Sequence, residues 1–398
     1  MATIPINPEI LRWTRETAGL DLLEAATKLQ INAARGLTPE QRLEALEVGS
    51  DQPSRPLLLK MAKLYRRSLL VFYLDTPPSR GNHGEDFRTL PAHPSIAQEG
   101  LVDSLVRDVK ARQRIVRSAL EEEDETTPLD LVASVKIEDG IPAIANVIRT
   151  KLGFRLETFR SQRAVSDAFT YLRNLVESSG IYVLLIGDLG SHHTAVSVDH
   201  FRGFALADPI APFIVINDQD AKSAWSFTLL HELAHIFLGK EGISASVSEG
   251  GIERFCNEVA AALLIQDSDL INISVRSDTD IESAISEISD FADQNNISRS
   301  MVAYRLFLQN LINRDYWQRL QEEFRSIWLS SRARERESRR SSEGGGPNYY
   351  VVRRFRAGHA LVGLVSRMTL SGSMTTIKAG RVLGVKPRNV FDLISLSR

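Results

Sequence analysis

The stretch WSFTLLHELAHIFLGK, residues 225–240, decides how the rest of the chain is interpreted. His231 and His235 are four residues apart, so on a helix at about 100° per residue they lie on one face, close enough to bind one metal ion. Glu232 directly follows the first histidine. A zinc ion held by neutral imidazoles lowers the pKa of a bound water towards ~7, and a nearby carboxylate then takes the proton. His-Glu-x-x-His supplies both parts, so the pattern predicts one zinc ion per chain, with Glu232 as the general base.

The residues around this motif predict a helix that is buried on most sides. No proline interrupts residues 221–238, and most of the positions between and beside the two histidines are apolar: Phe227, Leu229, Leu230, Leu233, Ala234, Ile236, Phe237 and Leu238. A core helix that merely contains two histidines would show the same apolar pattern. That second interpretation stays open at this point.

A third metal ligand is expected from the downstream stretch EGGIERFCNEVAAALLIQ, residues 249–266. Glu253 and Asn257 are four apart on a helical pattern, so Glu253 would reach the metal and Asn257, one turn on, would orient a ligand. The loop of residues 239–251 is long enough to turn the chain back. Glu258 is the competing ligand, but it is rotated about 140° from Glu253 and would point off the metal-facing side.

The segments FTLLHELAHIFLG (227–239) and ERFCNEVAAALL (253–264) together resemble the ImmA/IrrE family of metallo-endopeptidases. Its members carry Phe-Thr-Leu-x-His-Glu-x-x-His and then Glu-x-x-Ala-Asn/Asp-x-Phe-Ala-Ala-x-Leu-Leu. The resemblance implies a zincin-like domain in which His231, His235 and Glu253 bind zinc and Glu232 is the base. Cys256 stands where the family usually has Ala, and Ile265-Gln266 where it often has Met-Pro. The similarity extends to residues 202–218 and, more loosely, to both ends of the chain.

The same resemblance implies a protein substrate. Relatives of this design are thought to cut repressors and so switch on stress, phage-element or toxin–antitoxin genes, so the expected partner is a repressor or a toxin–antitoxin component. The competing class is a non-catalytic DNA-binding regulator or antitoxin that keeps the metal fold as a scaffold or sensor. Glu232 favours the enzyme, because a structural zinc site has no use for a base beside its ligand.

Length and composition indicate a cytoplasmic protein of two or three domains. The chain has 398 residues, of which 43% are hydrophobic and 25% charged, an ordinary composition for a soluble protein. We expect no membrane segment and no signal peptide, since there is no run of ~18 apolar residues and charges interrupt the first apolar pattern. A single cysteine, Cys256, excludes an internal disulfide and fits a reducing compartment. Its apolar surroundings are more typical of a buried side chain than of a nucleophile.

The net charge of −2 conceals an uneven distribution. Residues 1–80 carry 11 Lys and Arg against 9 Asp and Glu, and residues 332–398 carry 14 against 4, which leaves −14 for the middle of the chain. Any surface that binds nucleic acid or an acidic partner is therefore expected at the termini rather than around the metal.

Residues 1–78 predict a cluster of short helices that resembles an XRE-type helix-turn-helix domain. Asp21 and Thr38 are expected to cap two of these helices. In that interpretation two residues early in the recognition helix, Gln41 and Arg42, reach base edges, and the phosphate contacts come from Arg55, Lys60 and Lys63. The small charge of +2 is weak support for DNA binding, so a protein-docking or dimerisation module is the alternative.

The remainder predicts an α+β fold that is mostly helical. We expect a linker at residues 79–97, the zincin-like metallopeptidase domain at 98–330, a basic linker at 331–347 and a basic helical module at 348–398, which could also bind DNA. Short β-branched runs predict strands at 181–185 and 212–216, with 202–207 as a partner between them. The strand before the metal helix is the expected edge strand to which an extended substrate adds: Phe213, Ile214, Val215, Ile216 and Asn217.

Overall fold

A computed structural model describes residues 6–34, 36–78, 96–123, 126–191, 194–240, 249–341 and 348–395. The chain divides into two compact units. The described residues of Met1–Asn82, Arg88–Ala111 and Asp188–Phe201 form the first, and those of Arg112–Gly187 and Arg202–Arg398 belong to the second. The five-part division expected from the sequence stays a prediction.

The N-terminal part of the first unit is a bundle of short helices, as the sequence predicted. It contains α1 (Pro8–Glu16), α2 (Leu22–Lys28), α3 (Pro39–Glu47), α4 (Arg55–Leu64) and the 3-10 helix η1 (Leu69–Tyr73). Asp21 caps α2 and Thr38 caps α3, so local sequence signals set both helix starts. Residues 29–38 connect these two helices, a longer path than the tight turn of a typical helix-turn-helix.

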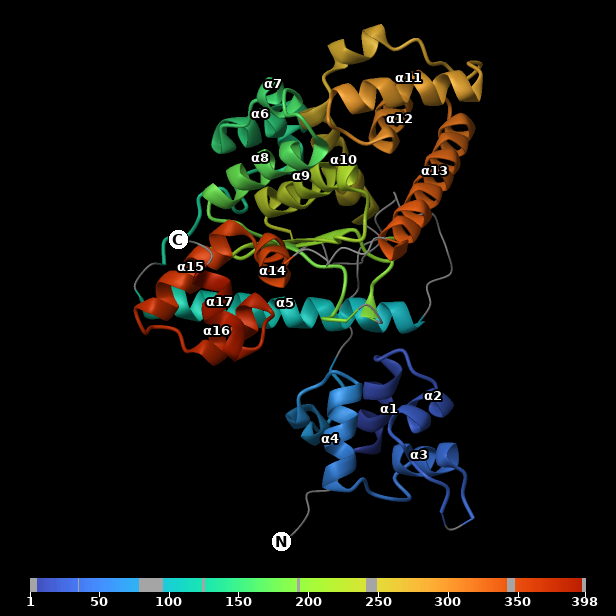
Figure 1. Cartoon of the computed structure of the whole chain (residues 1–398), viewed down its shortest axis with the longest axis vertical. Helices are drawn as coiled ribbons and strands as arrows, with labels where there is room; N and C mark the ends of the chain where they lie inside the picture. The colour runs from blue at the N-terminus through green and yellow to red at the C-terminus, as the bar shows by residue number, and fades with distance from the viewer. Residues whose placement is uncertain are drawn as a thin grey trace. The chain divides into compact units, whose positions relative to one another are not determined.

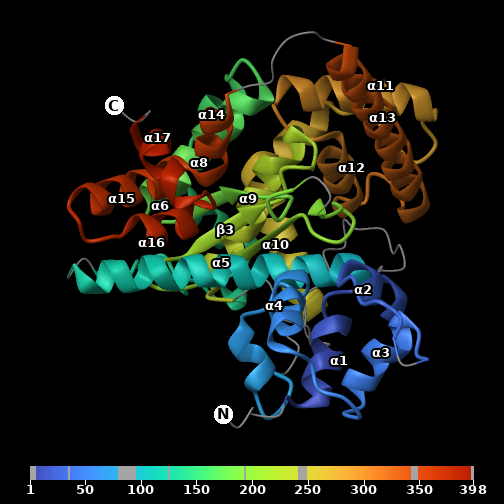
Figure 2. The same ribbon diagram turned by 60° about the horizontal axis from the view of Figure 1, so that its bottom comes forward.

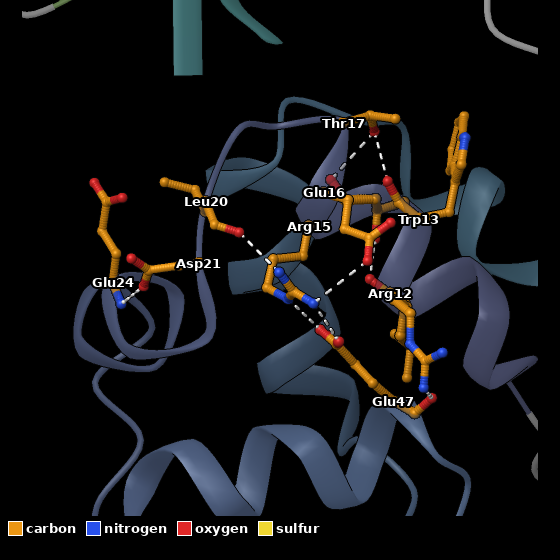
Figure 3. Close-up of polar contacts among 11 residues, drawn as sticks. Arg12, Trp13, Arg15, Glu16, Thr17, Leu20, Asp21, Glu24 and Glu47 are labelled. Carbon is orange, nitrogen blue, oxygen red and sulfur yellow. Dashed lines mark hydrogen bonds and ion pairs between the residues drawn. The ribbon is translucent and has the colours of Figure 1, made fainter. Parts of the chain in front are cut away.

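A buried ion pair ties the start of this bundle to the end of α3 (Figure 3). The Arg15 guanidinium donates to both carboxylate oxygens of Glu47, at 2.7 and 2.8 Å, and also to the backbone oxygen of Leu20 at 2.8 Å. Because both side chains are buried, the pair keeps its hydrogen bonds away from competing water. Nothing in the sequence pattern indicated this contact across 32 positions.

The second unit contains a three-stranded mixed sheet of β1 (Tyr182–Leu185), β2 (Gly203–Leu206) and β3 (Phe213–Ile216). The order is β1-β3-β2, with β1 parallel and β2 antiparallel to β3. The expectation that residues 213–217 form the edge strand is therefore wrong. Phe213, Ile214, Val215 and Ile216 are paired on both sides, and their fully buried apolar run is typical of a central strand.

Helices cover this sheet and carry the metal motif. We call residues 137–341 of the second unit, which contain the His-Glu-x-x-His motif, the metal domain. Its helices are α6 (Ile141–Leu152), α7 (Leu156–Arg160), α8 (Val165–Ser178), α9 (Lys222–Leu238), α10 (Glu249–Leu264), α11 (Ile281–Gln294), α12 (Arg299–Leu308) and α13 (Arg314–Ser341), with 3-10 turns η2 (Ile137–Asp139) and η4 (Asp267–Asn272). The helix α5 (Ile96–Glu122) runs from the first unit into the second. Figure 1 shows α9 beside the sheet, in contact with β2, β3, α8 and α10.

The C-terminal part of the second unit is a small helical group, α14 (Tyr349–Ala357), α15 (His359–Leu370), α16 (Thr376–Leu383), η5 (Pro387–Asn389) and α17 (Val390–Ser395) (Figure 2). Thr375 caps α16, and Gly384 ends it in a left-handed conformation. The structure differs from the expected linker at 331–347, because residues 331–341 continue α13. Arg and Glu have high helix propensity, and composition alone does not separate a charged helix from a linker.

Among the described residues, no helix combines the length and the apolar composition needed to cross a membrane.

Candidate metal centre

The helix α9 is buried along most of its length, which confirms the expectation from its apolar sequence. Every residue from Trp225 to Phe237 is buried. The ring of Phe169 on α8 packs edge-on against Trp225, with ring centroids 5.3 Å apart. Gly239 ends the helix in a left-handed conformation, at φ 66°. The two motif histidines are thus held in the middle of a packed domain and not at its surface.

Three side chains converge on one point between α9 and α10. The Nε2 atoms of His231 and His235 are 3.2 Å apart, and the Glu253 carboxylate lies 3.1 Å from the first and 3.3 Å from the second. All three residues are buried. His231, Glu232 and His235 also have ligand atoms within 4.8 Å of one another. Few arrangements other than a metal site bring such polar atoms together inside an apolar core.

The geometry fits a tetrahedral metal ion. Ligands at ~2.1 Å from a tetrahedral ion lie roughly 3.4 Å from one another, close to the three separations seen here. Two neutral imidazoles and one carboxylate form a donor set of single negative charge, which suits a divalent cation such as zinc. The residues present could therefore hold the ion that the sequence predicts.

The state of the Glu253 carboxyl supports the same conclusion. Burial by itself would raise its pKa, but hydrogen bonds with His231 and His235 lower the pKa of Glu253 to about 2. The group is therefore ionised near neutral pH, as a metal ligand must be. Glu258, the competing ligand, instead forms an ion pair with Arg254 at 2.8 Å. The structure brings Glu253 and not Glu258 to the two histidines.

Glu232 lies between the metal ligands and strand β2. Its side chain is buried, and a Cβ atom added to Gly203 of β2 would lie 2.8 Å from its Oε1 atom and 2.6 Å from Cγ2 of Thr228. The absence of a side chain at Gly203 therefore lets the strand pass directly over Glu232. Sequence reasoning assigned no role to Gly203, although a glycine inside an expected strand often marks such a close approach.

Two further residues of α10 lie beside the centre. The Asn257 side chain donates to the backbone oxygen of Glu253 at 2.8 Å, so it bonds to the backbone of a ligand residue and not to the carboxylate. Its Oδ1 atom is buried without a partner among the described residues. Cys256 is fully buried, and burial raises the pKa of its thiol well above the ordinary value. These properties agree with the expected role of Cys256 as a packed apolar side chain.

The residues expected to contact DNA lie on α3 and α4 of the N-terminal bundle. The Gln41 side-chain oxygen accepts from the backbone N–H of Thr38, and Arg42 donates to the backbone oxygen of Asn32 at 2.6 Å. Both side chains thus make hydrogen bonds within the bundle. Three exposed side chains of α4 are the expected phosphate contacts: Arg55, Lys60 and Lys63. DNA binding by these residues stays a prediction.

Comparison with known proteins identifies part of the chain. No curated protein and no solved structure matches it. The sequence model of one family, described as the IrrE N-terminal-like domain and termed Peptidase_M78, matches residues 177–307. That range contains the whole sheet, α9 and α10. Residues 177–307 are therefore an IrrE N-terminal-like domain with a buried His-Glu-x-x-His group, His231, Glu232 and His235.

Proposed function

We propose that this domain is a zinc-dependent endopeptidase that cleaves another protein. The peptidase domain would be one part of a regulatory protein. The observation that carries the proposal is the convergence of His231, His235 and Glu253, with Glu232 held beside them under a strand. A structural metal site is normally closed by four protein ligands, whereas three ligands and an adjacent carboxylate are typical of hydrolysis.

The chemistry assigns a separate task to each residue. His231, His235 and Glu253 would hold the zinc ion, which when bound polarises the scissile carbonyl and makes its water acidic. Glu232 would accept a proton from the attacking water and donate it to the leaving amine. The Glu232 side chain is buried beside the ligands, so the proton transfer would take place away from bulk water.

The sheet suggests where an extended substrate binds. The backbone N–H of Asn217 donates to the backbone oxygen of Arg202 at 2.8 Å. Hydrogen-bonded pairs alternate along an antiparallel ladder, so the backbone groups of Arg202 and Phe204 point towards β3. Gly203 and Ala205 then direct theirs away from β3, to a side on which no strand of the described residues pairs. Ala205 is fully buried and Gly203 is only partly buried, so we propose that an extended substrate passes β2 at Gly203, beside Glu232.

The substrate we propose is a transcriptional repressor or a toxin–antitoxin partner in the cytoplasm. This rests on the sequence resemblance and on the separate N-terminal bundle, which would recognise a partner protein. A reducing compartment suits the lone buried Cys256. The alternative is a non-catalytic regulator or antitoxin that uses the metal fold as a scaffold, and the basic C-terminal helices favour a nucleic-acid role in either case.

Incubation with a candidate substrate separates the two functions. The purified zinc-loaded chain is mixed with the XRE-type repressor or toxin encoded beside it, and the products are analysed by mass spectrometry. We expect one defined cleavage, its loss after chelation and its return when zinc is added back. If the partner binds and stays intact under all three conditions, the scaffold interpretation replaces the enzyme.

A further inference from the structure

The C-terminal module, residues 348–395, carries a concentrated positive charge. It contains eight Lys and Arg residues and a single acid, Asp392, whose carboxylate accepts a hydrogen bond from the Tyr350 hydroxyl at 2.8 Å. Its helices share a core of buried apolar side chains that includes Leu361, Val365 and Val382. The charge therefore belongs to a folded surface and not to an irregular tail.

One attachment of this module to the rest of its unit is a buried pair on α8. Arg173 and Glu177 are 2.8 Å apart and have side chains 5% and 4% exposed. Glu177 accepts from the backbone N–H groups of His359 and Ala360 at the start of α15, and Arg173 donates to the backbone oxygen of Phe355. The attachment thus uses backbone groups of the module and the Arg356 side chain, which pairs with Asp218, while four other basic side chains, Lys378, Arg381, Lys386 and Arg388, are exposed.

These four side chains gather around α16. On this helix the exposed positions are Ile377, Lys378 and Arg381, whereas Ala379, Gly380, Val382 and Leu383 are buried. The chain folds back onto α16 at Gly380, where an added Cβ would lie 2.8 Å from the Val385 oxygen. That turn carries exposed Lys386 and Arg388. We call Lys378, Arg381, Lys386 and Arg388 the basic corner.

The N-terminal bundle offers a poorer surface for an anion. Its described residues carry nine basic and nine acidic side chains, so they have no net charge. On α3, Glu44 is exposed, while Gln41 and Arg42 are hydrogen-bonded within the bundle. A recognition helix that faces phosphates with a glutamate and no excess of cations gains little from counterion release.

We propose that the basic corner of the C-terminal module binds duplex DNA, and that the N-terminal bundle does not. The four cations meet the phosphate backbone, and their charge matches the sign of a polyphosphate. The major groove is wide enough to admit a helix such as α16. Ile377, whose surface is 72% exposed, is on the same helix as Lys378 and Arg381 and is an apolar side chain of the kind that contacts a thymine methyl group. This activity is independent of the metal centre.

The test is a titration of the full-length protein against a fluorescently labelled mixed-sequence duplex at a series of salt concentrations. The variant reverses two exposed lysines, Lys378→Glu with Lys386→Glu. The matched control reverses two exposed lysines of the N-terminal bundle, Lys60→Glu with Lys63→Glu. Zinc content and thermal unfolding confirm that each variant is folded, and a chelated sample tests independence from the metal.

We expect the C-terminal variant to bind DNA more weakly by a factor on the order of 10 or more. A plot of the logarithm of its affinity against the logarithm of the salt concentration should be less steep, by about 0.9 for each phosphate that the variant no longer neutralises. The control should bind as the unmodified chain does. Weaker binding in the control alone would overturn the proposal, and so would an absence of binding at the lowest salt. In a competition experiment, poly-L-glutamate and unlabelled duplex are compared at equal concentrations of charge. If both displace the labelled duplex equally well, the proposal is also overturned, and an acidic protein partner is favoured.

Discussion

At the scale of single residues, the chemistry depends on side chains that the sequence places one helical turn apart. The shared face of His231 and His235 follows directly from their spacing, because four residues make slightly more than one helical turn. Glu253 could be preferred over Glu258 by its helical phase. The contact between Gly203 and Glu232 could not be predicted, since it depends on how a strand crosses a helix 29 positions away. The Arg15–Glu47 pair was missed for the same reason.

Glu232 should be needed for cleavage and not for metal binding. Glu232→Gln keeps the size of the side chain and removes its basicity, so we expect unchanged zinc content and a loss of cleavage of about 10² or more. Elemental analysis and a rate measurement on the same sample check both parts. Unchanged cleavage would remove Glu232 from the mechanism, and loss of zinc would mean that it is a ligand.

Gly203 should tolerate no side chain. In Gly203→Ala the new Cβ would lie within 2.8 Å of the Glu232 carboxylate, so either the base or strand β2 must shift. A displacement of this kind costs roughly 10-fold to 100-fold in rate. We expect zinc content to stay the same while cleavage falls.

The matched control for this variant is Gly251→Ala on α10, where an added Cβ meets no atom of the described residues within 4 Å. It should cleave as the unmodified chain does. Equal rates for Gly203→Ala and Gly251→Ala would show that β2 does not position the base.

At the scale of secondary-structure elements, local signals were predictable and pairing between distant segments was not. Asp21, Thr38 and Thr375 cap helices because each side chain bonds to a backbone N–H within its own first turn. The three strands were also found, but their order was not. The chain makes β1, β2 and β3 in turn, yet β3 inserts between the other two. An edge strand cannot be distinguished from a central one by its apolar run alone.

The attachment of α14 and α15 to α8 should depend on Glu177. Removing one charge of a buried pair leaves the other without compensation, at a cost of about 3–5 kcal/mol. We expect Glu177→Gln to lower the free energy of unfolding by an amount of that order, measured by denaturant titration. Glu258→Gln, which breaks a pair whose Arg254 side chain is 70% exposed, should cost less than about 1 kcal/mol. Similar losses in the two variants would contradict a structural role for the buried pair.

At the scale of the whole molecule, the charge distribution along the sequence predicted that a nucleic-acid surface would lie outside the metal centre. The sequence showed that the ends are basic and the middle is acidic, but it could not show which cations are exposed on a folded surface. In the structure the N-terminal charges largely balance one another, whereas the cations of the C-terminal module outnumber its single acid. The candidate metal centre and the proposed DNA surface therefore use different parts of the chain.

The central claim is that His231, His235 and Glu253 hold one catalytic zinc ion. It is tested most directly by the zinc content of the purified chain and of His235→Ala, Glu253→Gln and Glu258→Gln, measured by elemental analysis after dialysis. We expect about one zinc per chain in the unmodified protein and in Glu258→Gln, and loss of most of it in the other two variants. Full zinc occupancy in Glu253→Gln, together with loss in Glu258→Gln, would contradict the assigned site.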